Sequence, residues 1–187
     1  MITVEEKHIE EMRAHGERDY PFECCGLMLG RFDGGRKNVV ETYPISNARE
    51  EAAKRNRFLI RPEELMRGEK RAREQGLDVV GFYHSHPDDR AVPSQYDLEH
   101  AWPTYSYIVI AVEKGHAADL RSWEMKSDRS RFNEEEIVIA SEARPQGRSR
   151  LPGAPLLTRG LLTPERNNHA SHHHHTHAFA TVRRRRI

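Results

Sequence analysis

The sequence predicts an α/β protein in which helices flank a mixed β-sheet, followed by a disordered C-terminal tail. Over the first 140 residues, apolar runs of strand length alternate with helical patterns, an order typical of layered α/β folds. The length of 187 residues suits one domain with an appendage, and a hydrophobic content of 36% is enough for a modest core. Beyond residue 140 the composition changes to scattered prolines, arginines and histidines, which is typical of a disordered segment.

Capping and turn residues locate the elements of the first half. Thr3 and Glu6 have the spacing of a capping box, which predicts that a helix begins there. Asp33-Gly34-Gly35 indicates the turn of a β-hairpin, and Pro62 suits the first position of a second helix. The expected elements are a helix to about residue 16, strands over residues 25–31 and 38–43, and a helix over residues 62–75.

A buried strand and a short helix are expected next. The apolar run from Val79 to Tyr83 predicts a buried strand that continues toward Pro87, where a proline is expected to end it. Ser94 has the position of a helix N-cap, with Asp97 three residues later. Three further strands are expected over residues 105–112, 119–125 and 132–139.

Two histidines that are two residues apart suggest a metal site. Residues at i and i+2 of a strand point to one face, so His84 and His86 could reach a single ion. One turn of the short helix would present Ser94 and Asp97 together. Two neutral imidazoles and one carboxylate suit Zn²⁺, one per chain, and leave a fourth position for a water whose pKa the ion lowers to about 7. Such a site is suited to hydrolysis.

The same stretch also has plainer interpretations. An isolated His-x-His pair on a strand is commonly two solvated side chains, and Ser94 could be a helix cap and nothing more. Asp88 and Asp89 are expected to be solvated loop residues rather than metal ligands. Ser85 should face the opposite side of the strand, and His100 is expected near the site but not among the ligands.

The pattern His-x-His-Pro followed by Ser-x-x-Asp, over residues 84–97, resembles the signature of the JAMM (MPN-plus) zinc metallopeptidases. This family includes deubiquitinating enzymes and small prokaryotic members. The stretch Tyr20 to Gly30, YPFECCGLMLG, resembles the part of the bacterial members that holds the family's upstream glutamate, here Glu23. The resemblance covers roughly residues 1–140 and implies a cytidine-deaminase-like α-β-α sandwich around a mixed sheet.

The resemblance also implies a role for each motif residue. It implies that His84, His86 and Asp97 bind zinc. Glu23 would be the general base that takes a proton from water and delivers it to the leaving amine. Glu23 is one of 29 acidic residues, so this assignment depends on the resemblance. Ser94 would stabilise the oxyanion of the tetrahedral intermediate, a role that we prefer to capping alone.

Composition and cysteine usage predict a cytoplasmic protein. No segment is long enough to span a bilayer, and the N-terminal residues lack the pattern of a signal peptide. The two cysteines, Cys24 and Cys25, are adjacent and do not resemble a secreted disulfide framework, so reduced thiols are expected. The absence of a Pro-Cys-x-x-Cys ligand pair argues against a zinc nucleoside deaminase.

Residues 141–187 are expected to form the disordered tail and to have no catalytic role. They hold nine arginines and two acidic residues, a net charge of +7, so the remaining 21 basic and 27 acidic residues carry −6. His172 to His175 could bind metal and Arg183 to Arg186 could touch an acidic partner, but no aromatic interleaving supports specific recognition of nucleic acid. The tail could also fold back on the acidic body.

Three classes of function follow from these patterns. The family resemblance implies a peptidase or isopeptidase that cuts after the C-terminal Gly-Gly of a ubiquitin-like or sulfur-carrier protein, with no membrane partner. The alternatives are a non-catalytic MPN-type scaffold and a metal buffer that acts through the His-rich tail. Intact motif residues favour the enzyme: Glu23, His84, His86, Ser94 and Asp97.

Overall fold

The computed structural model describes residues 1–140, which belong to one compact unit. The predicted tail, residues 141–187, lies outside the described residues. Within the described part, no helix has the length and apolar character needed to cross a membrane. The elements in chain order are β1 (Ile2–Glu5), α1 (Glu6–Asp19), β2 (Cys25–Asp33), β3 (Arg36–Ile45), the 3-10 helix η1 (Glu51–Ala53), α2 (Pro62–Glu74), β4 (Asp78–Pro87), α3 (Gln95–His100), β5 (Ser106–Glu113), β6 (His116–Met125), β7 (Phe132–Glu135) and β8 (Ile137–Ala140).

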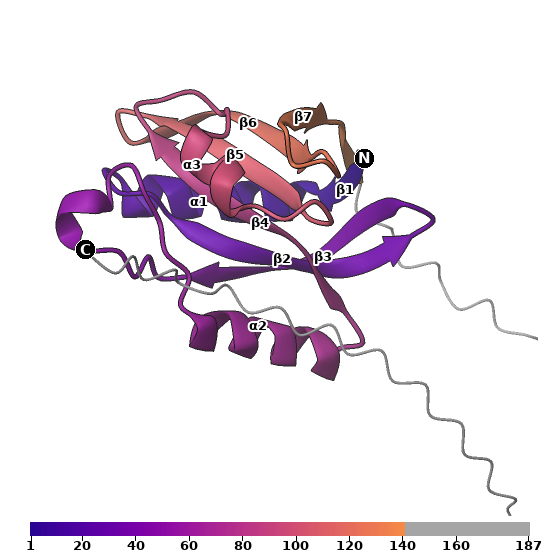
Figure 1. Ribbon diagram of the computed structural model, residues 1–187. Coiled ribbons are helices and arrows are strands. Elements are labelled where there is room, and N and C mark those ends of the chain that lie inside the picture. Colours follow the sequence, from indigo (N-terminus) through magenta and orange to yellow (C-terminus); the bar gives the residue numbers. More distant parts are fainter. Residues whose placement is uncertain (141–187) are drawn as a thin grey trace, which may run out of the picture. The chain divides into compact units, whose positions relative to one another are not determined.

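The described strands form one mixed sheet in the order β7-β6-β5-β4-β2-β3-β1-β8. β4 lies in its interior, antiparallel to β2 and parallel to β5. Helix α1 contacts β1, β3, β4, β5 and β6, whereas α2 contacts β2 and β4 from the other side (Figure 1). The predicted α/β class, with helices flanking a mixed sheet, is therefore confirmed.

The prediction of a capping box at Thr3 and Glu6 is wrong, because Thr3 lies in a strand. Ile2 and Thr3 pair with β3, and all four residues of β1 pair with β8. The alternation of buried Ile2 and Val4 with more exposed neighbours is a strand pattern, and this pairing outweighs the local capping signal. Helix α1 therefore starts at Glu6, after Glu5 as an N-cap without a side-chain hydrogen bond.

The single strand predicted over residues 132–139 is also wrong, because the chain breaks there into β7 and β8. β7 pairs with β6 at one end of the strand order, and β8 pairs with β1 at the other. Only Glu136 separates these two strands, so the sheet curls until its two ends meet. The break follows from tertiary pairing with β1, which the local sequence does not reveal.

A buried ionic cluster also joins the two halves of the curled sheet. Lys37 of β3 donates to the carboxylates of Glu124 of β6 and Glu135 of β7. The hydroxyl of Ser122 donates to Glu135 over 2.7 Å. Because a buried charge is tolerated only when it is paired, these partners fix how β3 faces β6 and β7.

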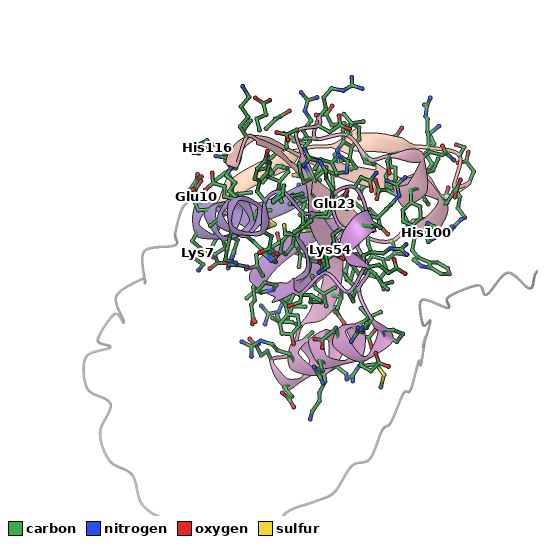
Figure 2. The ribbon with its side chains drawn as sticks, turned by 90° about the vertical axis from the view of Figure 1, so that its left-hand side faces the viewer. Lys7, Glu10, Glu23, Lys54, His100 and His116 are labelled. Atoms are coloured by element: carbon green, nitrogen blue, oxygen red, sulfur yellow. The ribbon has the colours of Figure 1, made fainter. Side chains whose placement is uncertain are left out.

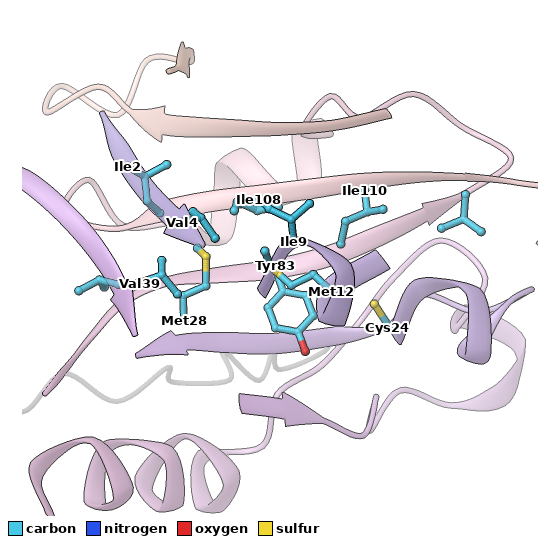
Figure 3. Packing of buried hydrophobic residues seen from close by; sticks show 12 residues of the cluster. Ile2, Val4, Ile9, Met12, Cys24, Met28, Val39, Tyr83, Ile108 and Ile110 are labelled. Atoms are coloured by element: carbon cyan, nitrogen blue, oxygen red, sulfur yellow. The ribbon is translucent and has the colours of Figure 1, made fainter. Parts of the chain in front are cut away.

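The main core fills the space between α1 and the sheet. Ile9 and Met12 of α1 lie next to Tyr83 of β4 and Ile108 of β5 (Figure 3). On the opposite face, Gly68 of α2 lies against the side chain of Leu27. β4 is buried from both sides over residues 80–86, which confirms the buried strand predicted from the apolar run Val79 to Tyr83, so its position is fixed by packing on both faces.

We predict that Gly30→Ala destabilises the fold by about 1–3 kcal/mol. The register of β2 and β3 shifts at Leu29/Gly30, and a Cβ on Gly30 would lie 2.0 Å from the carbonyl oxygen of Asn38. Backbone atoms cannot move aside as a flexible side chain can. The measurement is the free energy of unfolding in urea.

Gly35→Ala is the matched control. A Cβ there meets nothing within 4 Å, although the φ of +82° is unfavourable, so a cost of about 1 kcal/mol is expected. If Gly30→Ala were no more destabilising than Gly35→Ala, the close approach at the bulge would not constrain the fold.

Candidate metal centre

Strand β4 brings the two motif histidines to one face of the sheet. In the antiparallel pairing with β2, His84 lies opposite Cys25. The Nε2 atoms of His84 and His86 are 3.0 Å apart, and both side chains are buried. Ser85 lies on the face away from the histidines, as predicted. It is next to Gly16 of α1, and its hydroxyl accepts a hydrogen bond from the backbone N–H of Cys24 over 2.9 Å.

Helix α3 adds the carboxylate of Asp97 to the two histidines. Asp97 Oδ1 lies 3.7 Å from His84 Nε2, and Oδ2 lies 3.9 Å from His86 Nε2. The predicted capping box is confirmed: Ser94 Oγ accepts from Asp97 N, and the Asp97 side chain accepts from Ser94 N over 2.6 Å. The hydroxyl of Ser94 also donates to Asp97 Oδ2 over 2.7 Å.

The chemistry of these atoms fits a divalent cation. His86 Nδ1 lies 2.9 Å from the carbonyl oxygen of Arg90, which can only accept, so Nδ1 carries the proton and Nε2 presents a lone pair. One ligand atom from each of His84, His86 and Asp97 lies within 4.8 Å of the other two, so the group could hold a metal ion. Two nitrogens on one tetrahedral zinc lie roughly 3.3 Å apart, close to the 3.0 Å seen between the imidazoles.

The electrostatics of the group favour the ligand forms of the side chains. Burial lowers the pKa of His84, so its imidazole is neutral at physiological pH. Burial opposes ionisation of Asp97 as well. Attraction to His84 in its protonated form and the hydrogen bonds from Ser94 nevertheless hold the Asp97 pKa below its usual value. Neutral imidazole and ionised carboxylate are the forms that bind metal.

Glu23 lies beside this group at the start of β2. Cys25 of β2 lies opposite His84 of β4. The antiparallel pairing continues beyond this pair, because the N–H of Ser85 donates to the carbonyl of Cys24. Two residues further along this register, Glu23 lies across from His86. Glu23 is 5% exposed. Burial, followed by the charge of Asp97, raises the Glu23 pKa to about 8. A carboxyl group that titrates near neutral pH is suited to moving protons.

The segment of residues 46–61 holds Glu23 in place through its backbone. The N–H of Glu23 donates to the carbonyl of Lys54 over 2.8 Å, and Figure 2 shows Lys54 next to Glu23. The side-chain amide of Asn47 donates to the carbonyls of Glu23 and Arg57, over 2.9 and 3.0 Å. Its oxygen accepts from the N–H of Arg49 and of Leu59. Sequence reasoning missed Asn47, because an asparagine in a polar loop carries no distinguishing signal.

The loop after β4 is anchored by Asp88, which is exposed as predicted but not free in solvent. Its carboxylate accepts hydrogen bonds from Tyr20, Arg55 and the backbone N–H of Lys114, each over 2.9 Å. These contacts tie the end of β4 to the segment of residues 46–61 and to the turn after β5. Asp89 is exposed, and neither residue joins the metal group.

An aromatic and cationic rim borders the group. The ring of Phe58 packs against His84, with centroids 4.8 Å apart. Tyr96, which precedes Asp97, stacks on His100 at 4.1 Å and contacts the guanidinium groups of Arg49 and Arg57. Of the residues that form this rim, the sequence analysis pointed only to His100. Figure 2 shows His100 near the surface, and its Nδ1 contacts the carbonyl of Tyr96 rather than the metal group.

Residues 5–126 match the family described as prokaryotic homologs of the JAB domain. Because the match covers more than half of the chain, the chain belongs to this family. The JAMM/MPN family predicted from the two motifs is therefore confirmed. Cys24 and Cys25 are both buried and form no disulfide within residues 1–140, and the expected reduced thiols stay a prediction.

Two relatives and one solved structure illustrate the similarity. The desampylase of Haloferax volcanii is 39% identical over 92 residues, which are 49% of this chain and 63% of that protein. A probable TtuB-protein conjugate cleaving protease of Thermus thermophilus is 30% identical over 105 residues, 56% and 66% of the two chains. The chain thus spans less than two thirds of the length of each relative. The solution structure of protein DSY2949 from Desulfitobacterium hafniense is 35% identical, covers 76% of this chain and 94% of its own, and gives a TM-score of 0.67.

We predict that Asn47→Ala loosens the segment that holds Glu23. Four hydrogen bonds would be lost, three of them partly buried, which should lower the free energy of unfolding by about 1–3 kcal/mol. The N–H groups of Arg49 and Leu59 should exchange faster with solvent deuterium, while β4 keeps its protection. Native-state hydrogen exchange measures both regions in one experiment.

Asn56→Ala, an exposed asparagine in the same segment, is the matched control and should change stability by less than about 0.5 kcal/mol. Unchanged exchange at Arg49 and Leu59 in Asn47→Ala would contradict the role assigned to Asn47.

Proposed function

We propose that the chain is a zinc-dependent peptidase or isopeptidase that hydrolyses the amide bond after the C-terminal Gly-Gly of a ubiquitin-like or sulfur-carrier protein. One observation carries the proposal. His84, His86 and Asp97, from two separate elements, converge on one point beside the buried carboxyl group of Glu23. A cation site with an adjacent proton carrier is the arrangement that amide hydrolysis by water requires.

The residues of the site have separate roles in metal binding and in proton transfer. His84, His86 and Asp97 would hold the zinc ion, and the carbonyl of Arg90 fixes the tautomer of His86. When bound, zinc supplies a Lewis acid that activates water and polarises the scissile carbonyl. Glu23 accepts a proton from the attacking water and passes it to the leaving nitrogen.

Ser94 is proposed to donate its hydroxyl to the oxyanion that forms on the scissile carbonyl. In the structure this hydroxyl donates to Asp97 Oδ2, so it must turn from Asp97 to the substrate during the reaction. A hydroxyl has one proton and can serve only one acceptor at a time. The backbone N–H of Ser94 would still hold Asp97 in place during that turn.

The substrate class rests on the family and on the names of relatives. One relative is named for cleaving TtuB–protein conjugates. The motif resemblance implies a tail that ends in Gly-Gly, which would lie extended in a narrow groove where glycines let the carbonyl approach the metal. The loop of residues 88–93 is short and adds no insertion that would grip a large chain of linked proteins.

We predict that Glu23→Gln abolishes cleavage but not metal binding. The amide has nearly the shape of the carboxylate but cannot accept the proton, so the rate should fall by about 10²-fold or more. The measurement is cleavage of a Gly-Gly-linked ubiquitin-like fusion by the zinc-loaded full chain, followed by mass spectrometry of the products.

Glu50→Gln is the matched control, since it makes the same chemical change at an exposed position of the neighbouring segment and should leave the rate unaltered. A zinc-loaded wild-type chain that leaves the fusion intact would contradict the proposed activity and favour a non-catalytic binding scaffold.

A further inference from the structure

Helix α3 carries Asp97 to the metal group, but its own packing does little to fix where it lies. None of its six residues is buried. The capping box joins Asp97 to the N-cap Ser94, so it fixes the Asp97 side chain relative to α3 and not relative to the sheet. The Asp97 oxygens lie 3.7 and 3.9 Å from the histidine nitrogens, which is too far for hydrogen bonds. Other contacts must therefore hold α3 against the histidines.

The chain on either side of α3 is anchored to the sheet. Before the helix, the carbonyl of Ala91 accepts a hydrogen bond from the indole N–H of Trp123 over 3.0 Å. After it, the backbone N–H of Trp102 donates to the hydroxyl of Tyr107 over 2.6 Å. Both anchors lie more than one helical turn away from Asp97 along the chain. They limit where α3 can lie, but they leave its rotation toward the histidines free.

Tyr96 joins α3 to the segment of residues 46–61. Arg49 donates a hydrogen bond to the Tyr96 hydroxyl. The guanidinium carbons of Arg49 and Arg57 lie 5.5 and 4.7 Å from the centre of the Tyr96 ring. Guanidinium groups are attracted to aromatic rings, and the attraction grows where water is partly excluded, as it is at the half-buried Tyr96. Two attractive contacts and one hydrogen bond thus meet on a single side chain of α3.

The segment that Tyr96 contacts is itself fixed beside the metal group. The side-chain amide of Asn47 donates to the carbonyls of both Glu23 and Arg57. Tyr96 directly precedes Asp97, so holding its ring also sets the rotation of α3 about its axis. The contacts of Tyr96 therefore connect the helix that supplies the carboxylate ligand to the segment that holds the proton carrier.

We propose that Tyr96 is a positioning residue, which turns Asp97 toward the metal and Ser94 toward the scissile carbonyl by holding α3 against Arg49 and Arg57. This inference rests on the metal centre of the proposed function. Without these contacts, α3 would spend part of the time in positions from which Asp97 does not reach the histidines. The apparent affinity for metal would then fall in proportion to the fraction of molecules in which α3 is in place.

The test measures the affinity of the full chain for Co²⁺. Cobalt with tetrahedral ligands absorbs visible light far more strongly than cobalt with octahedral ligands, so this absorption band reports on a tetrahedral centre. Tyr96→Leu keeps an apolar side chain but removes the aromatic ring and the hydroxyl, and we expect it to bind Co²⁺ about tenfold more weakly or worse. Tyr96→Phe keeps the ring and should lose only about threefold, through the hydrogen bond from Arg49.

Arg57→Gln tests the partner of the Tyr96 ring. Removing a positive charge beside a metal site would by itself strengthen metal binding, because like charges repel. We nevertheless expect Arg57→Gln to weaken Co²⁺ binding in the wild-type background, where it removes the contact with Tyr96. In the Tyr96→Leu background it should weaken binding no further, because that contact is already absent. An equal loss in both backgrounds would mean that Arg57 acts independently of Tyr96 and would overturn the inference.

Tyr43→Ala is the matched control, because it removes another half-buried tyrosine, next to Gly68 of α2, and should leave the Co²⁺ affinity unchanged. A loss in Tyr43→Ala as large as that in Tyr96→Leu would indicate general destabilisation and overturn the inference. Equal Co²⁺ affinity in the wild type and Tyr96→Leu would also overturn it, while the proposed function would stand. A wild-type chain without the tetrahedral band would contradict the metal centre, and with it both the proposed function and this inference.

Discussion

The pairing of β4 with β2 and β5 is the constraint on which the site depends. It is fixed by burial on both faces, with Tyr83 in the core under α1 and His84 on the opposite face. Because side chains alternate along a strand, a shift of one residue would turn His84 and His86 into the core and Ser85 toward the metal centre. The same pairing brings Glu23, some sixty residues earlier in the chain, across from His86. The register of β4 with β2 therefore positions both the two histidines and the carboxyl group of Glu23.

A second constraint is the way the segment of residues 46–61 closes over the start of β2. It contributes little regular structure, yet its backbone and Asn47 satisfy both polar backbone groups of Glu23. A buried carboxyl group needs such fixed surroundings to hold one geometry. The same segment carries Arg49 and Arg57 to the rim, so the elements that position the proton carrier also shape the space beside it.

The sequence predicted the parts of the site that depend on local geometry. The i, i+2 spacing of His84 and His86 and the capping spacing of Ser94 and Asp97 appear in the structure as expected. Glu23 could not be found this way, because its position depends on a pairing between distant strands, and only the family resemblance pointed to it. Strand β1 and the break between β7 and β8 were missed for the same reason, since β1 and β8 are each four residues long and are defined by their pairing with each other. Arg49 and Arg57 were also missed, because the sequence does not distinguish an arginine beside a site from a solvated arginine in a polar loop.

The most direct test of the account is the number of zinc ions bound by the full chain and by His84→Ala, measured by native mass spectrometry. Any zinc held by residues 141–187 is common to both proteins, so the difference reports on the described domain alone. The account predicts that His84→Ala binds one zinc fewer than the wild type while keeping its fold. Equal zinc content in the two folded proteins would contradict it, because His84, His86 and Asp97 would then not form a metal centre.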